Sequence, residues 1–145
     1  GIGGVLCSCE GVVLAWFGEE LDRAFCDQLK AEGQSQLIGE LEALAVLAAL
    51  KLWTEKVRGK HLVIFVDNEG SKYAILRGYS KNPCLSKIVT AIAAAEDSAT
   101  VFCWYSRVPS EANVADGPSR GKSCSGVGEQ GRLRIERRWL EALVA

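Results

Sequence analysis

The 145-residue chain has no methionine, a single histidine, and no CxxC pair among its six cysteines. With His61 as the only imidazole, the sequence does not predict a zinc site, which uses clustered cysteine and histidine ligands. Scattered thiols favour a reduced, intracellular setting, cytoplasmic or nuclear, although the even cysteine count leaves disulfides open. Because an open reading frame begins with methionine, we expect the chain to be an excerpt of a longer polypeptide or a processed product.

Long apolar runs and a strong net charge are also absent. The longest apolar run, residues 43–50, is far shorter than the roughly 20 residues that cross a membrane, so no membrane association is predicted. The formal net charge is −1, so bulk electrostatics does not predict binding to a polyanion. Any affinity for nucleic acid must therefore come from local charge.

The first half of the chain predicts a hairpin followed by a long helix. Two β-prone runs, residues 5–9 and 12–17, are separated by a short link that contains glycine, which is typical of a β-hairpin. Residues 19–33 fit a short helix or an irregular connection. Residues 37–57 have a strongly helical pattern. Its expected inward stripe is Ile38, Glu42, Ala45, Val46, Ala49, Leu50 and Trp53, with Glu40 in a more solvated position.

The run 62–66 is short, apolar and rich in β-branched residues, which predicts a parallel strand covered on both faces. It ends on Asp67, and helical spacing then continues to a stop at Gly78. Asp67 therefore has two interpretations. It lies where α/β sheets place their ligands, or it caps the helix that follows.

The rest of the chain alternates helix, strand and loop. Residues 85–95 predict a helix and residues 100–105 an alternating strand. Residues 107–120 are rich in turn formers and present Arg107, Asn113, Asp116 and Arg120, either for function or for local turn hydrogen bonds.

Three carboxylates, Glu42, Asp67 and Asp116, come from distant parts of this pattern, and a mixed α/β sheet would let them meet at one edge. Clustered carboxylates repel one another and raise each other's pKa unless cations neutralise them. Oxygen ligands of this kind select Mg²⁺ or Mn²⁺. Two such ions about 4 Å apart can promote phosphodiester hydrolysis.

Three segments in this order resemble the ribonuclease H domain of retroelement reverse transcriptases. In the first, Glu42 is followed by alanine at +3 and +7 and by leucine at +8, similar to that family's second motif. The segment from Val66 to Gly78 is similar to its third motif. Residues 107–120, in which an asparagine precedes Ala-Asp and a Ser-Arg follows, look like its final motif. The resemblance covers residues 1–121.

The resemblance implies an RNase H-like mixed sheet, an antiparallel hairpin plus parallel strands, flanked by helices. It implies hydrolysis of the RNA strand of RNA–DNA hybrids by two Mg²⁺ or Mn²⁺ ions, next to a polymerase domain upstream in the same polypeptide. Glu42, Asp67 and Asp116 would hold the metal, with Glu40 as the alternative to Glu42. Contacts to the nucleic-acid backbone would come from Asn68, Arg107, Asn113 and Arg120.

The chain departs from the family at its start. The family's first motif is an aspartate on a central first strand, and no acid precedes Glu10 here. We expect this strand to lie upstream of Gly1, which would leave the 145-residue chain inactive alone and poorly stable. A non-catalytic domain that positions nucleic acid or bridges other domains is the alternative.

The composition divides the chain into three segments. Residues 1–121 form the RNase H-like part, and residues 122–131 are a Gly/Ser-rich linker. Residues 132–145 predict a short amphipathic basic helix or tail, with leucines and Trp139 inward and the arginines, including Arg132, outward.

Overall fold

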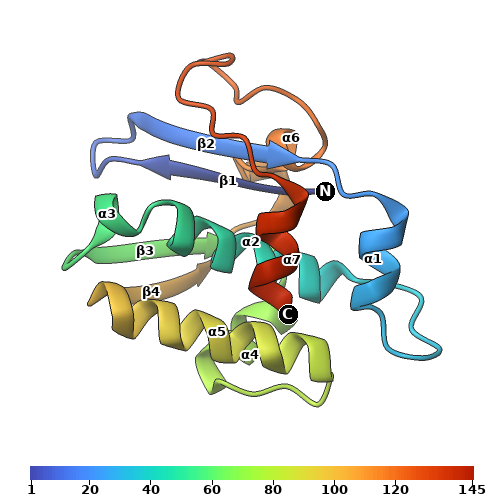
Figure 1. Ribbon diagram of the computed structural model, residues 1–145. Helices are drawn as coiled ribbons and strands as arrows, with labels where there is room; N and C mark the ends of the chain where they lie inside the picture. Colours follow the sequence, from blue (N-terminus) through green and yellow to red (C-terminus); the bar gives the residue numbers. More distant parts are fainter.

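The computed structural model describes all 145 residues as an α/β fold with two pairs of strands. Strands β1 (Ile2–Cys7) and β2 (Val13–Glu19) form an antiparallel hairpin, and β3 (His61–Val66) and β4 (Phe102–Arg107) form a parallel pair. No hydrogen-bonded ladder joins the two pairs, so each is a separate two-stranded sheet. The predicted hairpin and parallel strands are present, but the single mixed sheet is not formed (Figure 1).

The helices supply most of the packing. The elements after the hairpin are α1 (Arg23–Leu29), α2 (Ile38–Leu52), α3 (Thr54–Val57), α4 (Glu69–Arg77) and α5 (Pro83–Ala99), and after β4 come η1 (Ser110–Ala112), α6 (Asp116–Ser119) and α7 (Arg137–Val144). Helix α2 packs against α5, β1 and α4 (Figure 1). Its Leu44 and Leu47 are fully buried in the one large core. No helix is long and apolar enough to cross a membrane.

The buried face of α2 differs from the predicted stripe. Ile38 is exposed, whereas Ala43, Leu44 and Leu47 are fully buried. Glu40, expected in a solvated position, is buried at the start of the helix. The physical reason is that α2 packs against helices as well as against the hairpin, so its apolar surface spans more than one stripe.

Strand β3 was predicted to be covered on both faces, and this is wrong. Leu62 and Ile64 pack against the core, but Val63 and Phe65 on the opposite face are exposed. Helix α4 contacts both strands, and the Tyr105 hydroxyl of β4 donates to Glu96 of α5. Both helices also contact α2, so they lie on the core side of the strand pair. The other face of the β3–β4 pair remains uncovered.

The hairpin is covered on its second face by α6. Gly3 and Gly18 pair across the ladder, and a Cβ atom on them would lie 2.6 Å from the Ser119 nitrogen and 2.3 Å from the Pro118 oxygen. Both positions require glycine because the α6 backbone rests directly on the strands. This close approach brings Asp116, the first residue of α6, to the edge of the hairpin.

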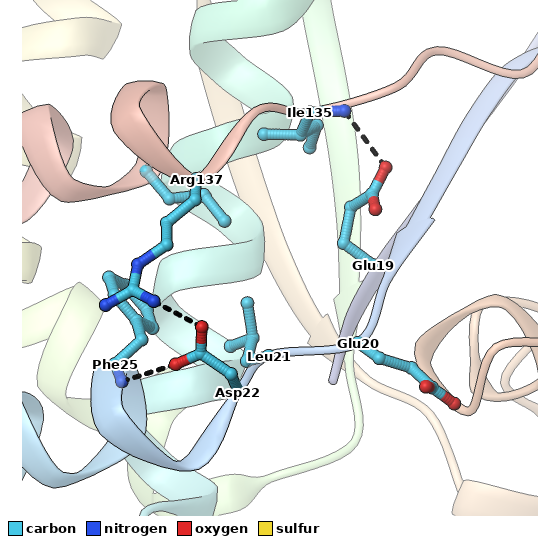
Figure 2. Close-up of a pocket in the computed structure, with 8 residues that line it drawn as sticks. Glu19, Glu20, Leu21, Asp22, Phe25, Ile135 and Arg137 are labelled. Carbon is cyan, nitrogen blue, oxygen red and sulfur yellow. Dashed lines mark hydrogen bonds and ion pairs between the residues drawn. The ribbon is translucent and has the colours of Figure 1, made fainter.

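Residues 132–145 contact the rest of the chain at the hairpin and beside α1. Arg132, predicted to point outward, instead lies over the Trp16 ring, with 4.9 Å from its guanidinium carbon to the ring centroid, and donates to the Gly18 carbonyl oxygen. Helix α7 places Leu140 in the core. Figure 2 shows Arg137 paired with Asp22, which also caps α1, and the Ile135 N–H donating to Glu19. A cavity of about 120 Å³ remains at this junction.

Candidate functional site

The three predicted carboxylates line one small cavity of about 40 Å³. Asp67 follows directly after β3, Glu42 is on α2, and Asp116 begins α6. The amino end of the hairpin closes the cavity. Its remaining lining residues are Gly1, Ile2, Gly3, Leu41, Ala45, Asn113, Ala115 and Ser119. The structure therefore gathers three carboxylates that are up to 74 positions apart in the sequence, from Glu42 to Asp116.

Glu42 is the carboxylate most affected by this arrangement. Burial, the negative charge of Asp67, a hydrogen bond with Asp67 and the negative charge of Asp116, in that order of size, together raise its pKa from 4.5 to about 7. A shared proton or a bound cation would relieve this repulsion. The Glu42 and Asp67 pair is thus a place where positive charge is favoured.

Glu40, the alternative ligand, does not line this cavity. Its Oε1 accepts a hydrogen bond of 2.8 Å from the Gln34 amide, and its charge raises the pKa of the Cys84 thiol, together with burial. It lies in the first turn of α2, where a carboxylate interacts favourably with the helix dipole. The structure gives Glu40 a local partner and places Glu42 beside Asp67.

Asp67 is not the cap of the helix that follows it. Asn68 is the N-cap of α4, and its Oδ1 accepts from the Ser71 N–H at 2.8 Å and from the Ser71 hydroxyl at 3.0 Å. The helix ends at Gly78, which has a φ of 69°. The Asn68 amide nitrogen makes no hydrogen bond within the chain, so it can still donate to a ligand.

Asn113 connects the two loops that carry Asp67 and Asp116. Its Nδ2 donates to Asp67 Oδ2 at 3.3 Å, and its Oδ1 accepts from the Ala115 N–H at 3.0 Å. The Asp116 N–H donates to the Asn113 carbonyl at 3.1 Å. Asn113 therefore positions the carboxylates. Its bond with the Ala115 N–H is the local turn hydrogen bond that the sequence allowed, whereas its contact with Asp67, 46 positions earlier, left no local pattern and was missed.

The two arginines of the final loop have acidic partners. Arg120 Nε lies 3.1 Å from both oxygens of Asp116, and Arg107 Nε lies 3.6 Å from Glu69. Both arginine side chains are at least half exposed, so these ion pairs are weak and can exchange for a phosphate. The Arg120 guanidinium thus gives the Asp116 carboxylate a cationic partner outside the cavity.

The donor set fits a divalent cation in part. No group of three or more His, Cys, Asp or Glu side chains is arranged so that it could hold a metal ion. However, Mg²⁺ is commonly bound by one or two carboxylates, with water and substrate phosphates as its other ligands. The Glu42 and Asp67 carboxylates meet that requirement. The Asp116 carboxylate is paired with Arg120 instead.

Comparisons with models of known protein families, with curated proteins and with solved structures found no match for this chain.

Proposed function

We propose that the chain is an RNase H-like domain that hydrolyses the RNA strand of RNA–DNA hybrids, as a module of a reverse transcriptase polypeptide. The observation that carries this proposal is the shared cavity of Glu42, Asp67 and Asp116. These residues belong to the three segments that resemble the family's motifs, and they come from a helix, a strand end and a loop. Their meeting in one cavity supports the proposal because the resemblance implied one metal site for these three residues.

The separation of the strand pairs supports the same proposal. The outer edges of β1 and β3, on the sides away from β2 and β4, make no hydrogen-bonded ladder with another strand. Two-stranded sheets are marginal on their own. One further strand, hydrogen-bonded to both edges, would join the pairs into the mixed sheet that an RNase H-like fold requires. Its end would lie beside the carboxylate cavity, where the family's first aspartate belongs.

Each residue of the site has a role in this function. Glu42 and Asp67 would hold the Mg²⁺ or Mn²⁺ ions, with Asp116 joining them once Arg120 turns to a phosphate. Asn113 keeps Asp67 oriented. Arg107, the last residue of β4, and the amide nitrogen of Asn68, two residues after β3, would contact the nucleic-acid backbone. The ions supply an activated water and stabilise the leaving oxygen in phosphodiester hydrolysis.

A non-catalytic domain that positions nucleic acid is the second candidate. The ion pair between Arg120 and Asp116 and the lack of a three-ligand arrangement favour it. Such a domain would bind hybrids and leave them intact. Binding of a hybrid without cleavage would therefore favour the non-catalytic domain, and cleavage would favour the nuclease.

The test is cleavage of an RNA–DNA hybrid with a labelled RNA strand by the full polypeptide that carries this chain, in Mg²⁺. Asp67→Asn is expected to lower the cleavage rate about a hundredfold or more, since metal ions contribute several kcal/mol to such reactions. Glu111→Gln, which alters an exposed carboxylate outside the cavity, is the matched control and should cut normally. Cleavage by Asp67→Asn at the parental rate would contradict the proposal.

A further inference from the structure

Ser71 is the most deeply buried polar side chain of the chain. Among the polar and charged residues only Glu40 and Ser71 are buried, and Ser71 is 0% exposed. It lies in the first turn of α4. Serine is usually exposed, and a buried hydroxyl is costly unless it is hydrogen-bonded. The partners of the Ser71 hydroxyl therefore decide why the residue can be buried at this position.

The Ser71 hydroxyl joins α4 to α2. Its Oγ lies 2.9 Å from the Gly39 carbonyl oxygen and 3.0 Å from Asn68 Oδ1, and both of these atoms are acceptors. Asn68 Oδ1 also accepts from the Ser71 N–H at 2.8 Å. Of these bonds, only the one to Gly39 leaves α4 and its cap. A Cβ atom on Gly39 would lie 3.6 Å from the Ser71 Oγ, so the two helices are in contact here.

The two partners of the hydroxyl are close in sequence to the two carboxylates of the site. Gly39 is three positions before Glu42 on α2, and Asn68 directly follows Asp67. Helix α4 contacts both α2 and β3, the elements that carry or lead to these carboxylates. Asn113, by contrast, connects Asp67 to the final loop. Ser71 therefore restrains Asp67 on the side that faces α2.

The Ser71 bond to Gly39 also differs in kind from the direct contact of the carboxyl groups. The hydrogen bond between Glu42 and Asp67 requires a proton on one of them. A bound cation displaces that proton, because metal ligands must be deprotonated. Two deprotonated carboxylates repel each other. The Ser71 bond is neutral, so it holds α4 against α2 whether or not the carboxyl groups carry a proton.

We propose that Ser71 is a positioning residue that sets the separation of Glu42 and Asp67 and thereby their affinity for a divalent cation. Ser71 is not among the residues that line the cavity, so it acts through the Gly39 carbonyl and the Asn68 side chain. Loss of a bond one step behind metal ligands typically weakens metal binding by about 10–100-fold. The inference rests on the metal site of the proposed function.

The test is a Mg²⁺ titration of the chain, followed by the amide NMR signals of Glu42 and Asp67. Ser71→Ala is expected to raise the Kd by about tenfold or more, because the carboxylates are no longer held at one separation. Gly39→Ala is the matched control at the same contact. Its added methyl group would lie 3.6 Å from the Ser71 Oγ, an ordinary van der Waals contact, and it keeps the carbonyl, so the Kd should be unchanged.

Three further variants separate positioning from stability. Ile92→Val, in the core on α5, should lower the urea midpoint of unfolding and leave the Kd unchanged. In a Glu42→Gln background, Ser71→Ala should change the Kd by less than about twofold, because no pair of carboxylates remains to be spaced. Ser71→Cys, which keeps a weak S–H donor, should have a Kd between those of the parent and Ser71→Ala.

The inference is overturned if Ser71→Ala binds Mg²⁺ as tightly as the parent, or if Ile92→Val weakens binding equally. An equal effect of Ser71→Ala with and without Glu42 would overturn it, as would a parent whose Glu42 and Asp67 signals do not respond to Mg²⁺. The titration contains no hybrid. A parent that binds Mg²⁺ but does not cleave hybrids would therefore contradict the proposed hydrolysis and leave the role of Ser71 intact.

Discussion

Glu42 and Asp67 are the residues whose chemistry depends most on each other. The sequence motifs predicted that both would serve one site, and the structure places them beside one cavity. The motifs could not show which of two neighbouring acids would be buried. Glu40 is the more buried one, because it lies in the first turn of α2 beside Gln34, a loop residue whose position depends on tertiary packing.

The raised pKa of Glu42 predicts a pH dependence of stability in the absence of metal. A carboxyl whose folded-state pKa is raised contributes stability below pH 4.5 that is lost as the pH rises to about 7. Allowing for solvent screening, the loss should be on the order of 1 kcal/mol. Urea unfolding in EDTA across this range measures it.

Glu42→Gln provides the control for this pH effect. It should remove this part of the pH dependence and be more stable than the parent at pH 8, because the neutral amide is not repelled by Asp67 and Asp116. An equally stable or less stable Glu42→Gln at pH 8 would show that the repulsion is absent.

At the scale of elements, the final helix shows what periodicity can and cannot predict. The apolar spacing predicted a helix over residues 132–145 and the inward side of Leu140, which packs in the core. The helix forms only over Arg137–Val144, and Leu133, predicted to point inward, is exposed. The spacing did not identify the surface that receives the helix. That surface depends on Asp22 and Glu19, whose partners Arg137 and Ile135 are more than a hundred residues later (Figure 2). Long-range pairs of this kind leave no local pattern.

Removing the core contact of α7 should destabilise the whole chain. Leu140 is 2% exposed, and Leu140→Ala is expected to lower the free energy of unfolding by about 3 kcal/mol, with one cooperative transition retained. Arg138→Ala, at an exposed position of the same helix, is the matched control and should change it by less than about 0.5 kcal/mol. Urea denaturation followed by circular dichroism measures both. If Leu140→Ala unfolded in two steps, the helix would be a separate unit.

At the scale of the whole molecule, the sequence predicted the hairpin and the two parallel strands but not their separation into two sheets. Composition indicated that β3 is apolar, and the prediction of two covered faces assumed a complete sheet around it. The structure has an open edge and an open face at β3 instead. The number of neighbouring strands is a property of the assembled fold, so the residues of one strand cannot encode it.

The open edge of β3 predicts a contrast between adjacent amides in hydrogen exchange. The carbonyls of Lys60 and Val66 accept hydrogen bonds from the N–H groups of Phe102 and Val108. The backbone N–H and C=O groups of the even-numbered residues of β3 therefore point toward β4. The amides of Val63 and Phe65 then face the open edge and should exchange orders of magnitude faster than that of Ile64. Equal protection of Val63 and Ile64 would mean that the edge is covered in solution.

The central claim is that the cavity lined by Glu42, Asp67 and Asp116 attracts a divalent cation, held first by Glu42 and Asp67, and paramagnetic Mn²⁺ tests it most directly. In a two-dimensional amide NMR spectrum, trace Mn²⁺ should first broaden the signals of Glu42, Asp67 and Asp116. Asp67→Asn should abolish this broadening, and excess Mg²⁺ should reverse it. First broadening at Glu19, Glu20 and Asp22 beside α1, with the cavity signals unchanged, would contradict the account.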